Sequence, residues 1–209
     1  MINYSVKSKI NYRQECIIDR YREVYGNRCI PKNKQYWTLA AQNFDEQGKI
    51  ISGRELDQVI KTGLISSPKQ FYGVDLNKNI QNLNRVGEPE ANWITDDIYQ
   101  AMVTQKKAGY FNPAILHLDF TKTPLTEAKS LARILYILTS WNINDLMVVA
   151  NFSLNLRYKD IINGNDIMAR LNKEPTFILS IDKWKFPPAY LKSHGAGSAT
   201  TMGTLHFFR

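Results

Sequence analysis

Apolar and polar residues alternate along the chain in blocks that predict short strands separated by helices. The apolar runs of strand length lie at residues 36–41, 70–76, 91–97, 113–120, 145–152, 176–181 and 202–208. Several of them, such as "PAILHLDF" and "DLMVVANF", are apolar throughout, which is typical of a parallel sheet covered on both faces. The pattern therefore predicts the doubly wound α/β fold class, because helices connect successive parallel strands.

The segments between these runs carry signals for helices. Residues 12–25 place apolar side chains at helical spacing and predict an amphipathic helix. Residues 52–55, "SGRE", form an S-x-x-E capping box at the start of another helix. Asn77 is well placed to cap a helix whose apolar residues are Ile80 and Leu83.

Positive charge is concentrated at the two ends of the chain, whose formal net charge is +8. Residues 1–36 carry eight Lys or Arg against three acids, residues 183–209 carry four against none, and residues 37–182 are nearly balanced. We expect residues 1–35 to form a basic helical extension and residues 36–209 to form the α/β domain. Basic ends on a neutral core suit a phosphate backbone or an acidic partner, and they equally suit solubility alone.

The sequence gives no sign of a membrane segment, a secretion signal or a metal site. The longest apolar stretches, such as "LARILYIL", fall far short of the roughly 20 residues that span a bilayer. The first residues, "MINYSVKSKINYRQ", lack the apolar core of a signal peptide. Cys16 and Cys29 make no disulfide framework, and no CxxC or HxxxH spacing occurs. We therefore expect a cytoplasmic protein with two reduced thiols and no metal.

Polar side chains stand at the end of most of the predicted strands. In chain order the first five strands end at Ala40–Ala41, Asp75, Asp96–Asp97, Asp119–Phe120 and Asn151–Phe152. In open α/β sheets, ligands bind outside the carboxyl ends of the strands. One acid at such a place is usual for a turn or a helix cap. A run of them along one sheet edge indicates a ligand site.

The order of these segments resembles the core of the class I S-adenosylmethionine-dependent methyltransferases. The resemblance covers roughly residues 36–209 and rests on "YWTLAA", "SGRELDQVIKTGLI", "FYGVDLNKNIQNLN", "NWITDDIY", "PAILHLDF" and "DLMVVANF", together with the last predicted strand. It implies a Rossmann-like methyltransferase fold with a mostly parallel seven-stranded sheet and an antiparallel last strand. It also implies that S-adenosyl-L-methionine is the cofactor.

The resemblance assigns cofactor-binding roles to the ends of the second and third strands. Asp75 matches the acid that holds the ribose hydroxyls in that family. Asp97, or its neighbour Asp96, matches the acid that contacts the adenine amino group. Leu76 and Ile98 match the apolar residues that cover the adenine ring.

The resemblance places the methyl group and the substrate at the end of the fourth strand, opposite Asp119 and Phe120. These two residues are therefore the candidate catalytic residues. The two histidines within apolar strands, His117 and His206, are expected to be hydrogen-bonded core residues instead.

One part of the family's pattern is absent from this chain. In the family, a glycine-rich turn follows the first strand and lets the backbone approach the cofactor closely. Here Ala40 and Ala41 run into a longer loop, whose first glycine comes seven residues after Ala41. Either residues 52–55, with Gly53 and Glu55, take over the role of this turn, or cofactor binding is weakened or lost.

Two functions remain open from the sequence. The first is an S-adenosylmethionine-dependent methyltransferase, with nucleic acid as the first guess for the acceptor because both ends are basic. The second is an inactive methyltransferase-like domain that binds nucleic acid or a protein partner. The sequence argues against a nicotinamide site, because the G-x-G-x-x-G fingerprint does not occur between the first strand and its helix and Asp75 alone cannot support one.

Overall fold

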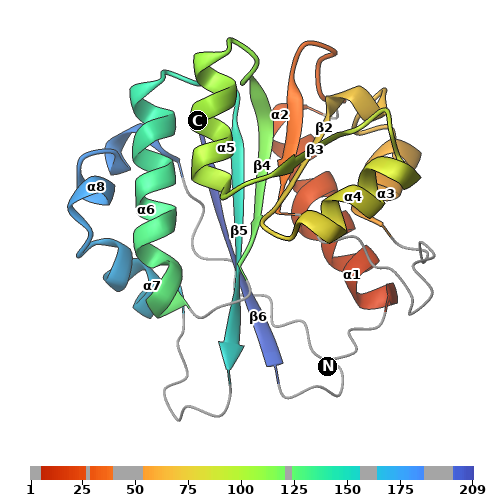
Figure 1. Cartoon of the computed structure of the whole chain (residues 1–209). Coiled ribbons are helices and arrows are strands. Elements are labelled where there is room, and N and C mark those ends of the chain that lie inside the picture. The colour runs from red at the N-terminus through yellow and green to blue at the C-terminus, as the bar shows by residue number, and fades with distance from the viewer. Residues whose placement is uncertain (1–5, 27–28, 40–53, 121–123, 156–163, 186–199) are drawn as a thin grey trace. The chain divides into compact units, whose positions relative to one another are not determined.

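A computed structural model describes residues 6–26, 29–39, 54–120, 124–155, 164–185 and 200–209 of the chain. Within these residues the strands are hydrogen-bonded in the order β3-β2-β1-β4-β5-β6, and Figure 1 labels β2 to β6. The strands are β1 (Gln35–Thr38), β2 (Phe71–Asp75), β3 (Asn92–Thr95), β4 (Pro113–Asp119), β5 (Met147–Asn155) and β6 (Thr200–Phe208). This is the strand order of the Rossmann-type doubly wound fold, so the predicted fold class is confirmed.

The sheet is mixed rather than wholly parallel. β1 pairs parallel with β2, and β2 pairs parallel with β3. β6 runs antiparallel to β5 over nine paired positions, from Met147 opposite Phe208 to Asn155 opposite Thr200. The prediction of an antiparallel last strand is therefore confirmed.

Helices connect and flank the strands, as the alternating pattern predicts. They are α1 (Val6–Arg13), the π-helical η1 (Gln14–Asp19), α2 (Arg20–Tyr25), α3 (Glu55–Lys61), η2 (Pro68–Gln70), α4 (Lys78–Gly87), α5 (Ile98–Lys107), α6 (Pro124–Ser140), α7 (Gly164–Leu171), α8 (Pro175–Ile178) and η3 (Ile181–Lys183). None of the helices in the described ranges is long and apolar enough to cross a membrane.

The chain divides into two compact units, and each is described by itself. The N-terminal unit comprises residues 3–116 and carries β1, β2 and β3. The C-terminal unit consists mainly of residues 117–209 and carries β5, β6 and α6 to α8. The boundary falls within β4.

Aromatic side chains form the core of the N-terminal unit. Tyr36 on β1 stacks on Phe71 on β2, with ring centroids 5.6 Å apart, and Phe71 also contacts Trp93 on β3. Gly73 lies directly beneath Trp93, and a Cβ atom at this position would be 2.3 Å from the indole ring. The "YGV" of β2 therefore needs glycine for close packing, because any side chain there would displace the tryptophan.

The N-terminal helix belongs to the same compact unit as these strands. Helical residues run from Val6 to Tyr25, so the predicted helix over residues 12–25 is confirmed and begins earlier. Ile17 and Ile18 are fully buried. The side-chain amide of Gln58 on α3 donates to the backbone oxygen of Ile10 at 2.8 Å, which ties the two helices together.

The helix α4 buries a different face from the one that its apolar residues predict. Asn77 caps it as expected, accepting from the backbone N–H groups of Asn79 and Ile80. The buried residues, however, are Gln81 and Asn84, whereas the predicted apolar residue Leu83 is 41% exposed. Hydrogen bonds of the Gln81 and Asn84 side chains account for this orientation.

The amide of Gln81 donates to two backbone oxygens of the sheet, Gly73 O at 3.1 Å and Ile94 O at 2.9 Å. Asn84 in turn donates to Gln81 Oε1 at 3.0 Å. Burying the amide of Gln81 is favourable because it satisfies two backbone carbonyl groups of β2 and β3. A pattern of apolar residues carries no information about such bonds.

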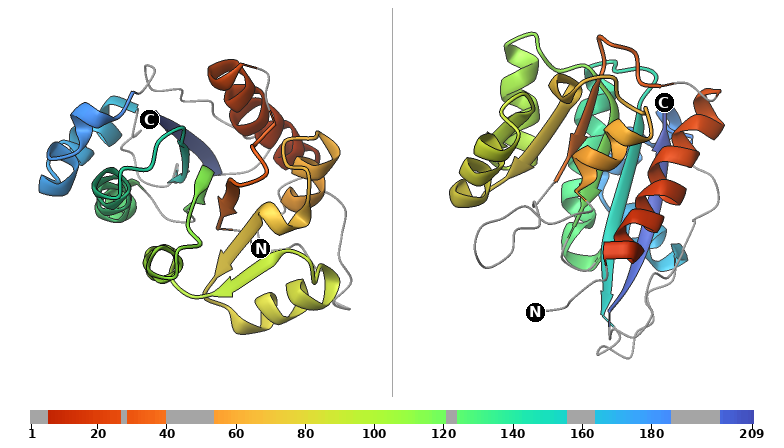
Figure 2. Two further views of the ribbon diagram at one scale, coloured as in Figure 1. Left: turned by 90° about the horizontal axis from the view of Figure 1, so that it is seen from above. Right: turned by 90° about the vertical axis from the view of Figure 1, so that its right-hand side faces the viewer.

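The C-terminal unit packs α6 against β5, and α7 and α8 pack against α6 (Figure 2). Its aromatic core includes Phe177 and Trp184, which both meet Phe207 on β6 edge to face at 6.4 Å. Trp184 also donates its indole N–H to the Thr139 hydroxyl at 2.9 Å.

The predicted strand over residues 176–181 is wrong, because this segment is helical. Pro175 occupies the first turn of α8, where its missing N–H costs nothing and its fixed φ favours a helix. The Ser180 hydroxyl donates back to the Thr176 carbonyl at 3.1 Å, and Phe177 is fully buried. In the described residues the sheet consequently has six strands, and the prediction of seven is wrong.

Candidate functional site

The carboxyl ends of β2 and β3 lie side by side in the N-terminal unit. The parallel register pairs Asp75, the last residue of β2, with Thr95, the last residue of β3. Paired residues of neighbouring strands are about 5 Å apart. Asp96 and Asp97 follow Thr95 directly, so the structure brings the predicted acids of these two strands to one sheet edge.

Asp75 is half-buried and takes part in the turn that leads into α4. Its Oδ1 accepts a hydrogen bond from the backbone N–H of Asn77 at 2.7 Å, and this bond fixes the side chain. Among the residues that the structure describes, Oδ2 accepts no hydrogen bond. A carboxylate that is held by one oxygen and open at the other is a strong acceptor for a ligand hydroxyl.

The two acids after β3 have different surroundings. Asp97 caps α5, because its Oδ1 accepts from the backbone N–H groups of Tyr99 at 2.9 Å and Gln100 at 3.4 Å. Asp96 is half-buried, and its Oδ1 accepts only from the N–H of Asp97 at 2.8 Å within the described part of the chain. Asp97 thus has a structural role that Asp96 lacks.

The two apolar residues predicted to cover a ring differ in exposure. Leu76, directly after Asp75, is 74% exposed, which leaves a large apolar side chain in solvent beside the carboxylate. Ile98, the first residue of α5, is buried. Leu76 therefore offers a free apolar surface, and Ile98 supports the start of α5.

Glu55, at the start of α3, is buried among partners from its own unit. It accepts a hydrogen bond from the Tyr36 hydroxyl and lies 3.5 Å from Arg13 Nε. Burial, followed by the nearby charge of Glu55, raises the pKa of Tyr36 well above its ordinary value. These contacts tie the N-terminal helix, β1 and α3 together.

Arg54, directly before α3, is a residue that sequence reasoning did not single out. Its guanidinium donates to Asp57 at 2.7 and 2.6 Å and also to Glu88, and these bonds raise the pKa of Arg54, with Asp57 the largest cause. Its Nη1 is buried and has no hydrogen-bond partner among the described residues. A buried donor without an acceptor is unfavourable, and an anionic ligand group would satisfy it. The one signal in the sequence was its place within residues 52–55, the segment considered as a replacement for the missing glycine turn.

Three predicted residues, Ala40, Ala41 and Gly53, lie outside the described residues. The described part of β1 ends at Thr38, which is buried. Within the described residues, no group of three or more His, Cys, Asp or Glu side chains is placed to hold a metal ion.

In the C-terminal unit, Asp119 stands at the end of β4 and is exposed. Phe120 beside it is buried and stacks on Phe152, with ring centroids 5.5 Å apart. The backbone N–H of Phe120 donates to Asn151 O at 3.1 Å. The pair of predicted catalytic residues therefore consists of one solvent-facing carboxylate and one core aromatic ring.

A buried amide network lies behind Asp119. The Asn151 Nδ2 group contacts His117 Nε2 at 2.9 Å and Asp119 Oδ1 at 3.5 Å, and Asn151 Oδ1 accepts from the Thr204 hydroxyl at 3.0 Å. Because Nδ2 can only donate, this contact fits an imidazole whose Nε2 accepts and whose proton is on Nδ1. The prediction that His117 is a hydrogen-bonded core histidine is confirmed.

No protein-family model matches the chain, and no curated protein matches it. Its structure is similar to a candidate SAM-dependent methyltransferase from Streptococcus mutans, with a TM-score of 0.44 and 10% identity over 66% of this chain and 38% of that one. It is also similar to a TehB-like SAM-dependent methyltransferase from Corynebacterium glutamicum, with a TM-score of 0.47 and 12% identity over 98% of this chain and all of that one.

A third similar structure is a candidate methyltransferase, yhhF, from Escherichia coli. Its TM-score is 0.40 and its identity 9%, over 93% of this chain and 89% of that one. The first of the three chains is much longer than this one, which spans 38% of it. The fold assignment rests on the strand order of the sheet and not on these likenesses.

Proposed function

We propose that the N-terminal unit binds S-adenosyl-L-methionine at the carboxyl ends of β2 and β3, and that the chain is a methyltransferase. The observation that carries the proposal is the placement of Asp75 next to Thr95 and Asp96, at the edge where doubly wound sheets bind their ligands. When bound, the cofactor supplies a methyl group on a positively charged sulfur.

The residues present fit the parts of this cofactor. The open Oδ2 of Asp75 suits a ribose hydroxyl, and Asp96, which caps no helix, suits the adenine amino group better than Asp97 does. Leu76 supplies apolar surface for the ring. Ala40, Ala41, Gly53 and Ile98 complete the proposed site on the strength of the family pattern alone.

In methyl transfer, the attacking atom of the acceptor forms a bond to the methyl carbon while the carbon–sulfur bond breaks, and its electron pair stays on sulfur. The reaction depends mainly on holding the two partners in line. The family resemblance nominates Asp119 and Phe120 for this step, and we propose nucleic acid as the acceptor. The absence of an acid–base constellation in the sequence is consistent with such chemistry.

Calorimetric titration of the full chain with S-adenosylmethionine and with its demethylated product tests this proposal. We expect Asp75→Ala to weaken binding about 10- to 100-fold, because a charged hydrogen bond contributes roughly 1.5–3 kcal/mol. Glu90→Ala, which removes an exposed acid near the amino end of β3, is the matched control and should bind as the wild type does. No binding at millimolar ligand would overturn the proposal.

A second function, a binding module without methyl transfer, is favoured by one observation. Glu55, which belongs to the segment considered as a replacement for the glycine turn, is bonded to Tyr36 and Arg13 instead of being open to a ligand. Such a module would retain oligonucleotides or a protein partner and give no heat with S-adenosylmethionine.

A further inference from the structure

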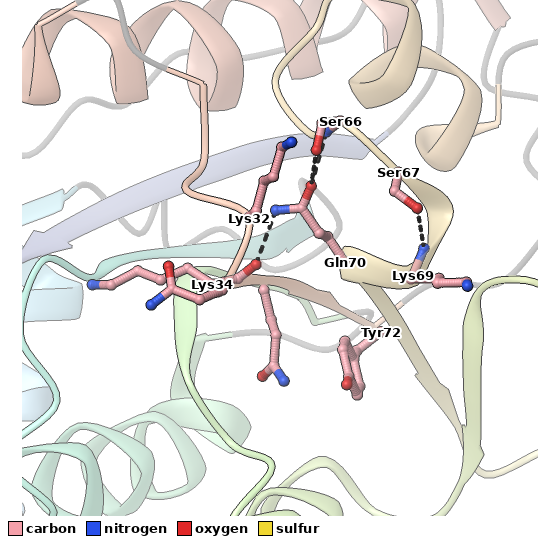
Figure 3. A pocket seen from close by; sticks show the side chains of 9 residues that line it. Lys32, Lys34, Ser66, Ser67, Lys69, Gln70 and Tyr72 are labelled. Atoms are coloured by element: carbon pink, nitrogen blue, oxygen red, sulfur yellow. Dashed lines mark hydrogen bonds between the residues drawn. The ribbon is translucent and has the colours of Figure 1, made fainter.

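A polar hollow of about 510 Å³ lies in the N-terminal unit where β1 and β2 begin (Figure 3). Three lysines, Lys32, Lys34 and Lys69, line it together with serine, amide and tyrosine side chains. β2 rises about 3.3 Å per residue, so its two ends are roughly 13 Å apart. The hollow is therefore separate from Asp75, which stands at the opposite end of the same strand.

One buried glutamine, Gln70, fixes the two segments that form the hollow. Its Nε2 donates to the backbone oxygens of Pro31 at 2.9 Å and Lys34 at 3.1 Å. Its Oε1 accepts from both the backbone N–H and the hydroxyl of Ser66, at 2.9 and 2.8 Å. These bonds hold the segment before β1, which carries Lys32 and Lys34, against the segment before β2. The shape of the hollow is therefore fixed by hydrogen bonds.

The charged residues that line the hollow are all positive. No acid is among its lining residues, all of which the structure describes. Lys32 and Lys69 are exposed, and neither forms an ion pair within the described ranges. The net charge of +8 adds a favourable long-range field for anions.

Hydroxyl donors add to the lysines. Burial raises the pKa of Tyr72, against a smaller opposing effect of its hydrogen bond with Gln35, so the phenol stays protonated at neutral pH. Its ring is held by stacking on Trp37 at 4.8 Å. The Ser67 oxygen accepts from the Lys69 backbone N–H at 3.3 Å, which leaves the hydroxyl proton to donate. Lysine ammonium and hydroxyl groups together are typical of sites for phosphate oxygens.

The arrangement of the lysines favours an extended anion over a compact one. In Figure 3 the side chains of Lys32, Lys34 and Lys69 lie on different sides of Gln70 and point away from one another. Cations that are spread around a hollow can each neutralise a different phosphate of a chain. They are poorly placed to bind one phosphate group together. We propose that this hollow is a contact site for the sugar–phosphate backbone of a nucleic acid strand.

This inference rests on the nucleic-acid part of the proposed function and gives it a location. Contacts at the beginning of β1 and β2 would hold the strand at the end of β2 opposite Asp75. These contacts would set the affinity for the strand and its position on the protein, and they would take no part in methyl transfer. Changing these lysines should therefore weaken binding of different sequences about equally.

Fluorescence anisotropy of the full chain with labelled 12-nucleotide single strands, over a series of salt concentrations, tests the proposal. We expect Lys32→Ala with Lys69→Ala to lower affinity about tenfold. The slope of log K against log salt should become shallower by about 1.4, because each lost phosphate contact contributes about 0.7. The control pair, Lys61→Ala with Lys107→Ala, makes the same charge change on exposed lysines of α3 and α5 and should keep the wild-type slope.

The proposal is overturned if both pairs of variants lose affinity equally, or if the wild-type protein does not retain the strands. Calorimetry with adenosine triphosphate and with inorganic phosphate separates the other source of phosphate. Micromolar one-site binding that Lys32→Ala with Lys69→Ala removes would identify a small-phosphate pocket and overturn the polymer site. The same variants titrated with S-adenosylmethionine should bind it normally, so failure here is distinct from failure of the cofactor site.

Discussion

The side-chain amide of Asn151 holds residues of three strands in the C-terminal unit through His117, Asp119 and Thr204. Replacing it with leucine removes the donor to His117 Nε2 and the acceptor of the Thr204 hydroxyl. A buried polar group that loses its partner costs about 1–3 kcal/mol. We expect Asn151→Leu to lower the free energy of unfolding in urea by about 2–5 kcal/mol.

Thr204→Val is the matched variant for this network, because it removes only one of the bonds. It should cost about 1 kcal/mol. Nitrogen NMR shifts of His117 should also show a neutral ring with the proton on Nδ1. A charged His117 at neutral pH, or an Asn151→Leu protein as stable as wild type, would contradict the assignment.

The two cysteines differ in reactivity for a physical reason. Burial raises the pKa of the Cys16 thiol from 9.0 to about 11, whereas Cys29 is exposed. Because the thiolate is the reactive form, an alkylating reagent at pH 8 should modify Cys29 in the folded protein and reach Cys16 only after unfolding. Peptide mass spectrometry after a short labelling pulse measures both sites in one sample.

The same thiol makes stability depend on alkaline pH. A raised pKa in the folded state contributes stability that is full below pH 9 and is lost as pH rises toward 11. Between these values Cys16 should steepen the fall in unfolding free energy by up to about 1.4 kcal/mol per pH unit. Cys16→Ala should show a shallower fall, whatever its stability at pH 7, and an unchanged slope would count against a buried thiol.

At the scale of elements, α4 shows which contacts orient a helix. Gln81→Leu would leave Gly73 O and Ile94 O without their side-chain donor, and we expect it to destabilise the fold by about 1–3 kcal/mol. Leu83→Gln changes an exposed residue of the same helix and should stay within about 0.5 kcal/mol of wild type. Chemical denaturation of both variants checks this prediction. If Leu83→Gln were the less stable variant, the helix would bury the apolar face that the sequence predicts.

The elements also show what sequence patterns can and cannot predict. Apolar runs predict β2, β4 and β5, because strands buried on both faces have few polar residues. The segment after Pro175 has the same apolar character as a strand, and only the proline at its first turn distinguishes it as a helix. The edge that Asp75 shares with Asp96 follows from parallel topology, and the sequence predicts it.

The buried amide network could not be predicted in the same way. Thr204 meets Asn151 because of the antiparallel register of β5 and β6, which pairs these two residues directly. The hydrogen bond from Gln70 to Pro31 O likewise joins segments that are 39 residues apart in the chain. Neither contact produces a periodic pattern in the sequence, because each depends on how distant segments are aligned in the folded protein.

At the scale of the whole molecule, the two proposed sites lie at opposite ends of β2 and are proposed to bind chemically different ligands. Ligands that bind the folded state stabilise it by mass action and slow local opening around their site. Hydrogen exchange of the full chain should therefore give two separate footprints. S-adenosylmethionine should protect backbone amides at residues 75–77 and 95–98, and a 12-nucleotide strand should protect residues 32–35 and 66–70.

The two footprints should also respond separately to mutation. Asp75→Ala should remove only the cofactor footprint, because the residue contacts the turn after β2 and none of the hollow. Lys32→Ala with Lys69→Ala should remove only the oligonucleotide footprint, because these exposed lysines lie at the other end of β2. A strand that instead protects residues 75–77, and does so equally in the lysine variants, would place the nucleic acid contact at the cofactor edge and leave the hollow without a ligand.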